Sequence, residues 1–240
     1  MKQEQSGFTL VEIAIVLVII GLLLGGILKG QELINSARVR NLADTASGIQ
    51  AAYFGFLDRY RRIPGDWEAT AASTGIGVTI NNPAADANTN NGRIDNPTGS
   101  AAATYKEPNA MWEQLAAAGF IQGSYTGTGA EPDNTGTLAP LNAFNTPIIV
   151  GRTPDFEPAP APSARLNLVI GRNIPVDVMR ELDVKVDDSK PTTGSLRQTL
   201  ESPTVFAYTN NWGGSADCID ASNEWDVIND EQDCNAALLF

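Results

Sequence analysis

The stretch FTLVEIAIVLVIIGLLLGGIL, residues 8–28, decides the fold of the N-terminal part of the chain, and its only ionisable residue is Glu12. A membrane hydrocarbon core about 30 Å thick needs about 20 apolar residues at helical rise, and this run reaches that length. The polar residues MKQEQS and then Gly7 precede it. A secretory signal peptide instead has a shorter apolar core that ends in small residues. The stretch therefore predicts a membrane-length helix of another class.

Glu12 is the residue in this run that needs an explanation. A carboxylate inside a membrane helix costs free energy, so it marks a functional residue whose partner should be sought. No cation lies within one helical turn, because Lys2 precedes the run and Lys29 follows it. Cleavage between Gly7 and Phe8 would create a positive α-amino group beside Glu12. In a low-dielectric environment that amine could pair with Glu12 of the same or a neighbouring chain. The alternative is an uncleaved signal anchor that tolerates a glutamate near the membrane interface.

The motif GFTLVE, residues 7–12, follows a short charged leader and opens an apolar run. This arrangement resembles the class III leader and N-terminal helix of type IV prepilins and pseudopilins. The resemblance implies cleavage after Gly7 by a prepilin peptidase and N-methylation of Phe8. It also implies that Glu12 neutralises the N-terminal amine when subunits dock. The partners implied are other pilin subunits, the peptidase, the inner membrane with its assembly platform, and an ATPase that acts indirectly.

Apolar residues continue beyond Lys29 at alternating steps of three and four, which predicts one apolar stripe on a helix. The sequence IPGD, residues 63–66, ends this pattern, because proline disfavours helical geometry at the preceding residue. We expect an α+β fold. Residues 1–7 are the leader, 8–63 a spine helix with 8–28 in the membrane or filament core, and 64–240 a head with a small antiparallel sheet. The stripe, which we expect to pack against the head, contains Leu42, Ala46, Ile49, Tyr53, Phe56, Tyr60 and Ile63.

Within the head, residues 68–104 are rich in Ala, Gly, Asn and Thr and predict a loop. A short helix is expected within 109–125, with Gly119 as its C-terminal cap, and another over 174–188 with Pro175 near its first turn. Short β-branched or aromatic runs predict strands at 146–151, 165–171 and 204–209. The segments DRYRRIPGDW, MWEQLAAAGFIQGSY and LDVKVDDSKPTTGSLR also resemble one subgroup of large pilin-like proteins, in which we expect glycine where Ser189 stands.

The net charge of the chain and its residue composition exclude several classes of functional site. The chain has a net charge of −12 and no histidine. Ser-His-Asp sites, Cys-His sites and zinc sites with histidine ligands are therefore excluded, and a basic nucleic-acid surface is not expected. Cys218 and Cys234 predict one disulfide in an oxidising compartment. A catalytic thiol is the weaker alternative, because Asp217 and Asp233 would raise the pKa of either thiol.

We expect no cofactor, although two stretches are candidates for calcium. In DANTNNGRID, residues 86–95, oxygen-bearing side chains alternate at Asp86, Asn88 and Asn90, and Asp95 ends the stretch. Asn91 is expected to adopt the left-handed conformation there. The alternative is a polar turn without a metal. The second candidate is the acidic C-terminal stretch, with Asp217, Asp220, Glu224, Asp226, Asp230, Glu231 and Asp233.

Aromatic and basic residues offer further binding surfaces. Trp212 and Trp225 are either binding platforms or anchors in the core, and the aromatic residues of the stripe are expected at the seam between spine and head. The cluster of Arg59, Arg61 and Arg62 either contacts phosphate or an acidic neighbouring subunit, or is a solvated helix end.

We interpret the chain as a pilin-like structural subunit rather than an enzyme. Processing after Gly7 would be followed by polymerisation into a surface filament for adhesion, motility or DNA uptake. The protein would reside in the bacterial inner membrane before assembly and in an extracellular pilus afterwards. One alternative is a pseudopilin of a type II secretion system, in a periplasmic filament. A different alternative is a membrane-anchored extracytoplasmic enzyme or binding domain, because carboxylates suffice for glycoside hydrolysis.

Overall fold

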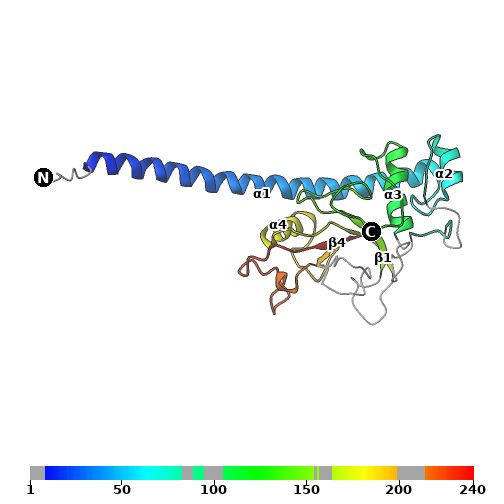
Figure 1. The fold of residues 1–240 in the computed structure, drawn as a ribbon. Helices are drawn as coiled ribbons and strands as arrows, with labels where there is room; N and C mark the ends of the chain where they lie inside the picture. Colours follow the sequence, from blue (N-terminus) through cyan, green and yellow to red (C-terminus); the bar gives the residue numbers. More distant parts are fainter. Residues whose placement is uncertain (1–8, 83–88, 95–104, 154–155, 157–163, 199–213) are drawn as a thin grey trace. The chain divides into compact units, whose positions relative to one another are not determined.

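The computed structural model describes residues 9–82, 89–94, 105–153, 156, 164–198 and 214–240 (Figure 1). The chain divides into two compact units, Met1–Arg38 and Val39–Phe240. Its elements are helices α1 to α4, a 3-10 turn η1 (Ala216–Cys218) and strands β1 to β4. The combination of one long apolar helix with a small antiparallel sheet confirms the predicted α+β class.

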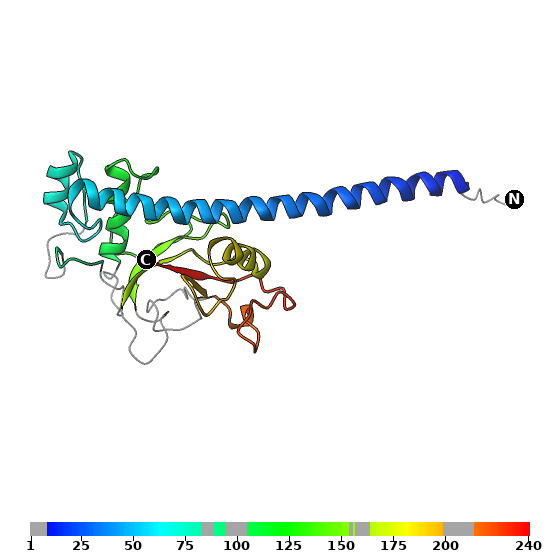
Figure 2. The same cartoon turned by 180° about the vertical axis from the view of Figure 1, so that it is seen from behind.

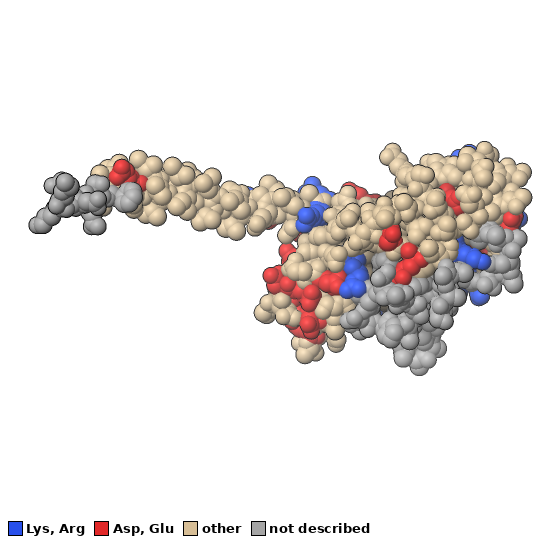
Figure 3. Space-filling model, viewed as in Figure 1, with Lys and Arg blue, Asp and Glu red and all other residues tan. Residues whose placement is uncertain are grey.

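Helix α1 (Leu10–Tyr60) contributes to both units. In the first unit, every residue from Leu10 to Lys29 is exposed, although most of them are apolar. Such a helix needs an apolar environment around it, as in a membrane or a bundle of helices. Among the described residues, α1 is long and apolar enough to cross a membrane. On the face that Figure 3 shows, the described residues of this part carry few charged side chains.

In the second unit, the remainder of α1 buries one stripe of side chains in the core. The predicted stripe is confirmed at Leu42, Ala46, Ile49 and Phe56, whereas Tyr53 and Tyr60 are half-buried at its edge. The stripe also includes neighbours that we did not predict, namely Val39, Ala43 and Ala52.

Helix α1 ends at Tyr60, three residues before the predicted end at Ile63. Arg61 adopts the left-handed conformation with φ 54°. A helix cannot continue through such a residue. The chain has therefore already left the helix when it reaches Pro64.

The sheet has the strand order β1-β2-β4-β3, and every pair is antiparallel. Its strands are β1 (Ile149–Thr153), β2 (Arg165–Val169), β3 (Leu196–Gln198) and β4 (Ala236–Leu239). Successive residues point to opposite faces, so Leu168 and Leu238 join the core that contains α1, while Val169 and Leu239 join a second cluster around Tyr105. The strands predicted at 146–151 and 165–171 are confirmed with shifted bounds. The strand predicted at 204–209 lies outside the described residues.

The described residues also include three helices shorter than α1, which are α2, α3 and α4. Helix α2 (Ala69–Ile76) shows that the loop predicted over 68–104 was wrong in this part. Glu68 stabilises its N-terminus, because the carboxylate accepts hydrogen bonds from the backbone of Thr70 and Ala71 at 2.9 and 3.0 Å.

Helix α3 (Lys106–Ala117) begins three residues earlier than predicted, and Trp112 and Leu115 are fully buried. The predicted cap Gly119 is confirmed. Its φ is 79°, and the backbone bonds from Gly119 to Ala116 and from Phe120 to Leu115 form a Schellman motif.

Helix α4 (Val176–Val186) lies within the predicted range, with Pro175 just before its first turn. Met179 and Leu182 face the core shared with α1 and the sheet. Figures 1 and 2 both show α4 next to β4. After α4, Ser189 has φ 68°, so the turn keeps the left-handed conformation for which we expected glycine.

Candidate functional site

The N-terminus of α1 holds the predicted assembly residue, Glu12. Its Oε2 accepts hydrogen bonds from the backbone N–H and from the hydroxyl of Thr9, both at 2.8 Å. Thr9 Oγ1 in turn accepts the Glu12 backbone N–H at 3.3 Å. This reciprocal pair is a capping box, in which a threonine and a glutamate three residues later satisfy donors of the first helical turn. The capping box fixes the carboxylate at the start of the helix.

The sequence contains a signal for this capping box, which our predictions did not include. The pattern T-x-x-E at residues 9–12, followed by an apolar run, is a typical helix start. In the described part of the chain, Glu12 forms no ion pair, and its Oε1 forms no hydrogen bond with a described residue. The predicted cleavage residues Gly7 and Phe8 lie outside the described residues, so the amine pairing remains a prediction.

The second candidate region is the C-terminal loop closed by Cys218 and Cys234. The two cysteines form a disulfide, as predicted, with 5.8 Å between their Cα atoms. Trp225 lies within the loop and is buried in the core of the second unit. The interpretation of Trp225 as a core anchor is therefore confirmed, while Trp212 lies outside the described residues.

An ion pair and hydrogen bonds connect the same loop to the segment before α4. Arg172 forms an ion pair with Asp233 through two of its nitrogen atoms, and the Asn173 backbone donates to the same carboxylate at 3.0 Å. Burial alone would raise the pKa of Asp233, but the hydrogen bonds from Arg172 and Asn173 and the charge of Arg172 outweigh it and lower that pKa. The Cys234 backbone also donates to Ile174 at 2.9 Å.

Most of the candidate ligands in the first calcium candidate lie outside the described residues. Asp86, Asn88 and Asp95 lie outside the described residues, and of the four candidate ligands only Asn90 is described. Asn90 has φ 62° and Gly92 has φ 86°. We had expected Asn91 to adopt the left-handed conformation, and the described part of this stretch has it at Asn90 and Gly92 instead.

The middle of this stretch contacts Asp66, a residue that we did not predict as part of a site. The Asp66 carboxylate accepts the backbone N–H groups of Asn91 and Gly92 at 2.9 and 2.8 Å, and its backbone oxygen accepts that of Asn90. A buried carboxylate thus orders residues 90–92 through backbone donors.

The basic cluster lies at the C-terminal end of α1. Arg61 forms an ion pair with Asp58 at 3.2 Å, and both side chains are about four-fifths exposed. Arg59 lies over the ring of Tyr60, 5.1 Å from its centroid. An exposed ion pair contributes little stability. These contacts are those of a solvated helix end, which was the simpler of the two interpretations.

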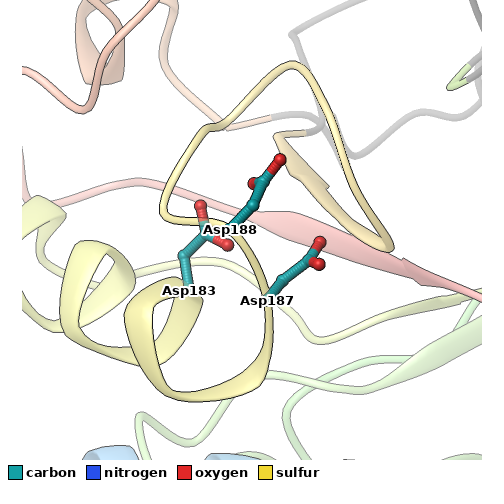
Figure 4. Close-up of side chains that lie close together, drawn as sticks. All are labelled: Asp183, Asp187 and Asp188. Atoms are coloured by element: carbon teal, nitrogen blue, oxygen red, sulfur yellow. The ribbon is translucent and has the colours of Figure 1, made fainter.

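An acidic cluster that the sequence analysis missed lies at the end of α4. It consists of Asp183 in the helix and of Asp187 and Asp188 directly after it, and one carboxylate oxygen of each lies within 4.8 Å of the others (Figure 4). Asp183 and Asp187 are four residues apart, a spacing that places two side chains on one face of a helix. That spacing was visible in the sequence.

The electrostatics of this cluster are unusual for aspartates. Asp183 is fully buried, and its Oδ2 accepts the indole N–H of Trp225 at 2.7 Å. The pKa of Asp183 is raised to about 6. Burial and, to a smaller extent, the negative charges of Asp188 and Asp187 raise it, while hydrogen bonds from the Trp225 side chain and the Ser189 backbone lower it.

The comparison with known families identifies the N-terminal segment. The prokaryotic N-terminal methylation motif matches residues 2–28. No curated protein and no solved structure matches the chain. The motif is the class III leader of type IV pilins and pseudopilins, so the resemblance drawn from GFTLVE is confirmed. A leader of this type implies a structural subunit that is processed by a prepilin peptidase, assembles with other pilin subunits and is anchored in the inner membrane before assembly.

Proposed function

We propose that the protein is a type IV pilin-like subunit that is cleaved after Gly7, methylated at Phe8 and polymerised into a helical surface filament. The observation that carries this proposal is the methylation motif over residues 2–28, which continues into an exposed apolar helix with one carboxylate in its first turn. Exposed apolar surface on this scale needs a partner. The membrane supplies it before assembly, and neighbouring subunits supply it in the filament.

In this proposal Glu12 and Thr9 act together. Cleavage would make Phe8 the first residue and Glu12 the fifth. Thr9 holds Oε2 of Glu12, which leaves Oε1 for the new amine of Phe8. A carboxylate that is already oriented loses less side-chain entropy when it forms an ion pair. The charge of the amine and that of Glu12 would then cancel in the apolar filament core.

A test of this function compares two glutamates on α1. Glu12→Ala is produced beside unmodified subunits, and its incorporation is measured in filaments sheared from the cell surface. Glu32→Ala is the matched control, because Glu32 is an exposed acid on the same helix that pairs with Lys29 at 2.6 Å. We expect both variants in the membrane and only Glu32→Ala in filaments at the normal level. Equal incorporation of the two variants would refute the role of Glu12.

The location of the filament separates a pilus subunit from a secretion pseudopilin. The size of the second unit and its C-terminal disulfide favour a surface pilin. We therefore expect the processed chain in the sheared surface fraction. A processed chain that is confined to the periplasm would instead assign the protein to a type II secretion pseudopilus. A chain that stays monomeric in the membrane would favour an anchored enzyme or binding domain.

A further inference from the structure

The acidic cluster at the end of α4 has the arrangement of a preformed ligand set. Asp187 Oδ2 accepts the backbone N–H groups of Ser195 and Leu196, the latter at 2.9 Å. Asp188 accepts the Lys190 backbone N–H at 3.0 Å and the Thr193 hydroxyl. These bonds hold both carboxylates in place, and Figure 4 shows the three side chains gathered around the turn that follows α4.

The buried member of the cluster is Asp183. Asp183 has an exposed fraction of 0%. Its Oδ2 is bound by Trp225, but its buried Oδ1 has no hydrogen-bond partner among the residues that the structure describes. Buried polar atoms in proteins almost always have a partner, and an exception calls for an explanation such as a missing ion. This orphan oxygen belongs to the carboxylate that faces Asp187 and Asp188.

The charge of the cluster is also not balanced by nearby cations. Among the described residues, none of the three aspartates takes part in an ion pair. Hydrogen bonds from the Thr193 hydroxyl and the Lys190 backbone, and to a smaller extent the charge of Lys190, lower the pKa of Asp188. The Lys190 and Asp188 side chains do not form an ion pair. Three carboxylates with oxygens within 4.8 Å of one another repel each other unless a cation or a proton lies between them.

We propose that Asp183, Asp187 and Asp188 bind a calcium ion. Calcium takes six to eight oxygen ligands at about 2.3–2.6 Å, so two oxygens on one ion lie at most about 5 Å apart. The spacing in the cluster meets this limit. The ion would supply the missing partner of Asp183 Oδ1, and water would complete its coordination. Magnesium demands shorter and more regular bonds, which suits the fixed carboxylates of this turn less well.

The bound ion would connect three parts of the second unit. Asp183 belongs to α4 and holds Trp225 of the disulfide loop, while Asp187 holds the backbone where β3 begins. Calcium would therefore fasten the end of α4 to β3 and to the C-terminal loop. This site differs from both calcium candidates in the sequence analysis and does not depend on the proposed filament function.

The position of Trp225 allows a direct test. The full-length chain in detergent is freed of calcium with a chelator, and terbium is added as a probe that occupies calcium sites. An ion on Asp183 would lie beside the Trp225 indole, so excitation of tryptophan should produce terbium emission that calcium abolishes by competition. Calcium binding itself is measured by calorimetry.

Two variants assign the binding to the cluster. Asp188→Asn removes an exposed ligand, and we expect it to weaken calcium binding at least about tenfold. Glu181→Gln is the control, because it makes the same change of charge at an exposed position of α4 outside the cluster, and we expect normal binding. A thermal melt in chelator checks that Asp188→Asn is folded.

Three results would overturn the proposal. The first is the absence of calcium binding by the unmodified chain at millimolar calcium. The second is unchanged binding in Asp188→Asn, which would place the ion elsewhere, for example among residues 86–95. The third is equal weakening in Asp188→Asn and Glu181→Gln, which would show only a general effect of surface charge.

Discussion

Replacement of Phe56 by alanine tests whether the second part of α1 is an integral piece of the second unit. Phe56 is fully buried, and its ring centroid lies 4.7 Å from that of Tyr60, 6.1 Å from that of Trp67 and 6.0 Å from that of Phe120. Truncation of a buried phenylalanine costs about 3–5 kcal/mol. Because three aromatic contacts are lost together, we expect a value of about 4 kcal/mol, near the middle of this range.

Phe54→Ala is the matched control, since Phe54 is the same residue type two positions earlier and is 55% exposed. It contacts Tyr53 and Phe240 at ring distances of 5.5 and 6.5 Å. We expect its loss to cost less than about 1 kcal/mol.

The assay is urea unfolding of the full-length protein in detergent, followed by tryptophan fluorescence. With an m-value of about 3 kcal/mol/M, Phe56→Ala should lower the midpoint by more than about 1 M. Equal midpoints for Phe54→Ala and Phe56→Ala would refute the reasoning, because α1 would then contribute no buried stripe to the core.

Three further predictions concern the second unit. Replacement of Cys218 and Cys234 by serine should lower the free energy of unfolding by about 3 kcal/mol in the chain-entropy model, measured by denaturant unfolding without reductant. Asp233→Asn should cost on the order of 1 kcal/mol at neutral pH. Because Arg172 and its neighbours lower the pKa of Asp233, this contribution is complete above the unfolded pKa of about 4 and is lost as the pH falls through the lower folded value. The stability difference between Asp233→Asn and the unmodified protein should therefore shrink in acid, and a constant difference would contradict the assignment. Gly65→Ala should lower the free energy of unfolding by more than about 1 kcal/mol. Gly65 has φ 94°, and a Cβ atom there would lie 2.4 Å from the Glu107 backbone oxygen. An unchanged melting temperature of this variant would contradict the left-handed conformation and the close contact at Gly65.

The sequence predicted the elements that have a strong local signal, such as apolar periodicity or a β-branched run, and missed those without one. The stripe of α1 was visible because apolar residues recur at helical spacing. Its end was placed three residues late, because the left-handed conformation of Arg61 has no signal in the residue type. Helix α2 was missed since ATAASTGI has only one large apolar residue, Ile76, and therefore shows no apolar periodicity, although Glu68 before it is a capping residue.

Strands β3 and β4 were missed for a related reason. They are only three and four residues long, and AALL in β4 lacks β-branched residues. Their place in the sheet depends on long-range pairing with β2 and with each other, which local sequence does not reveal. Short strands that are buried on both faces also lose the alternation of apolar and polar residues.

The sequence predicted Glu12 and the disulfide but not the acidic cluster. Glu12 was predicted because it is the only ionisable residue in the apolar run, and the disulfide was predicted because the chain has only two cysteines. The acidic cluster at Asp183 escaped notice because its meaning depends on the burial of Asp183, and burial depends on Trp225 reaching across from 42 residues away. The sequence offered only the four-residue spacing between Asp183 and Asp187, which is common on solvated helices.

The measurement that tests the central claim most directly is the intact mass and N-terminal sequence of the chain recovered from sheared surface filaments. The account predicts a chain that begins at N-methylated Phe8, with Cys218 and Cys234 oxidised. A chain that still begins at Met1 would contradict it, because Glu12 would then have no new amine to neutralise.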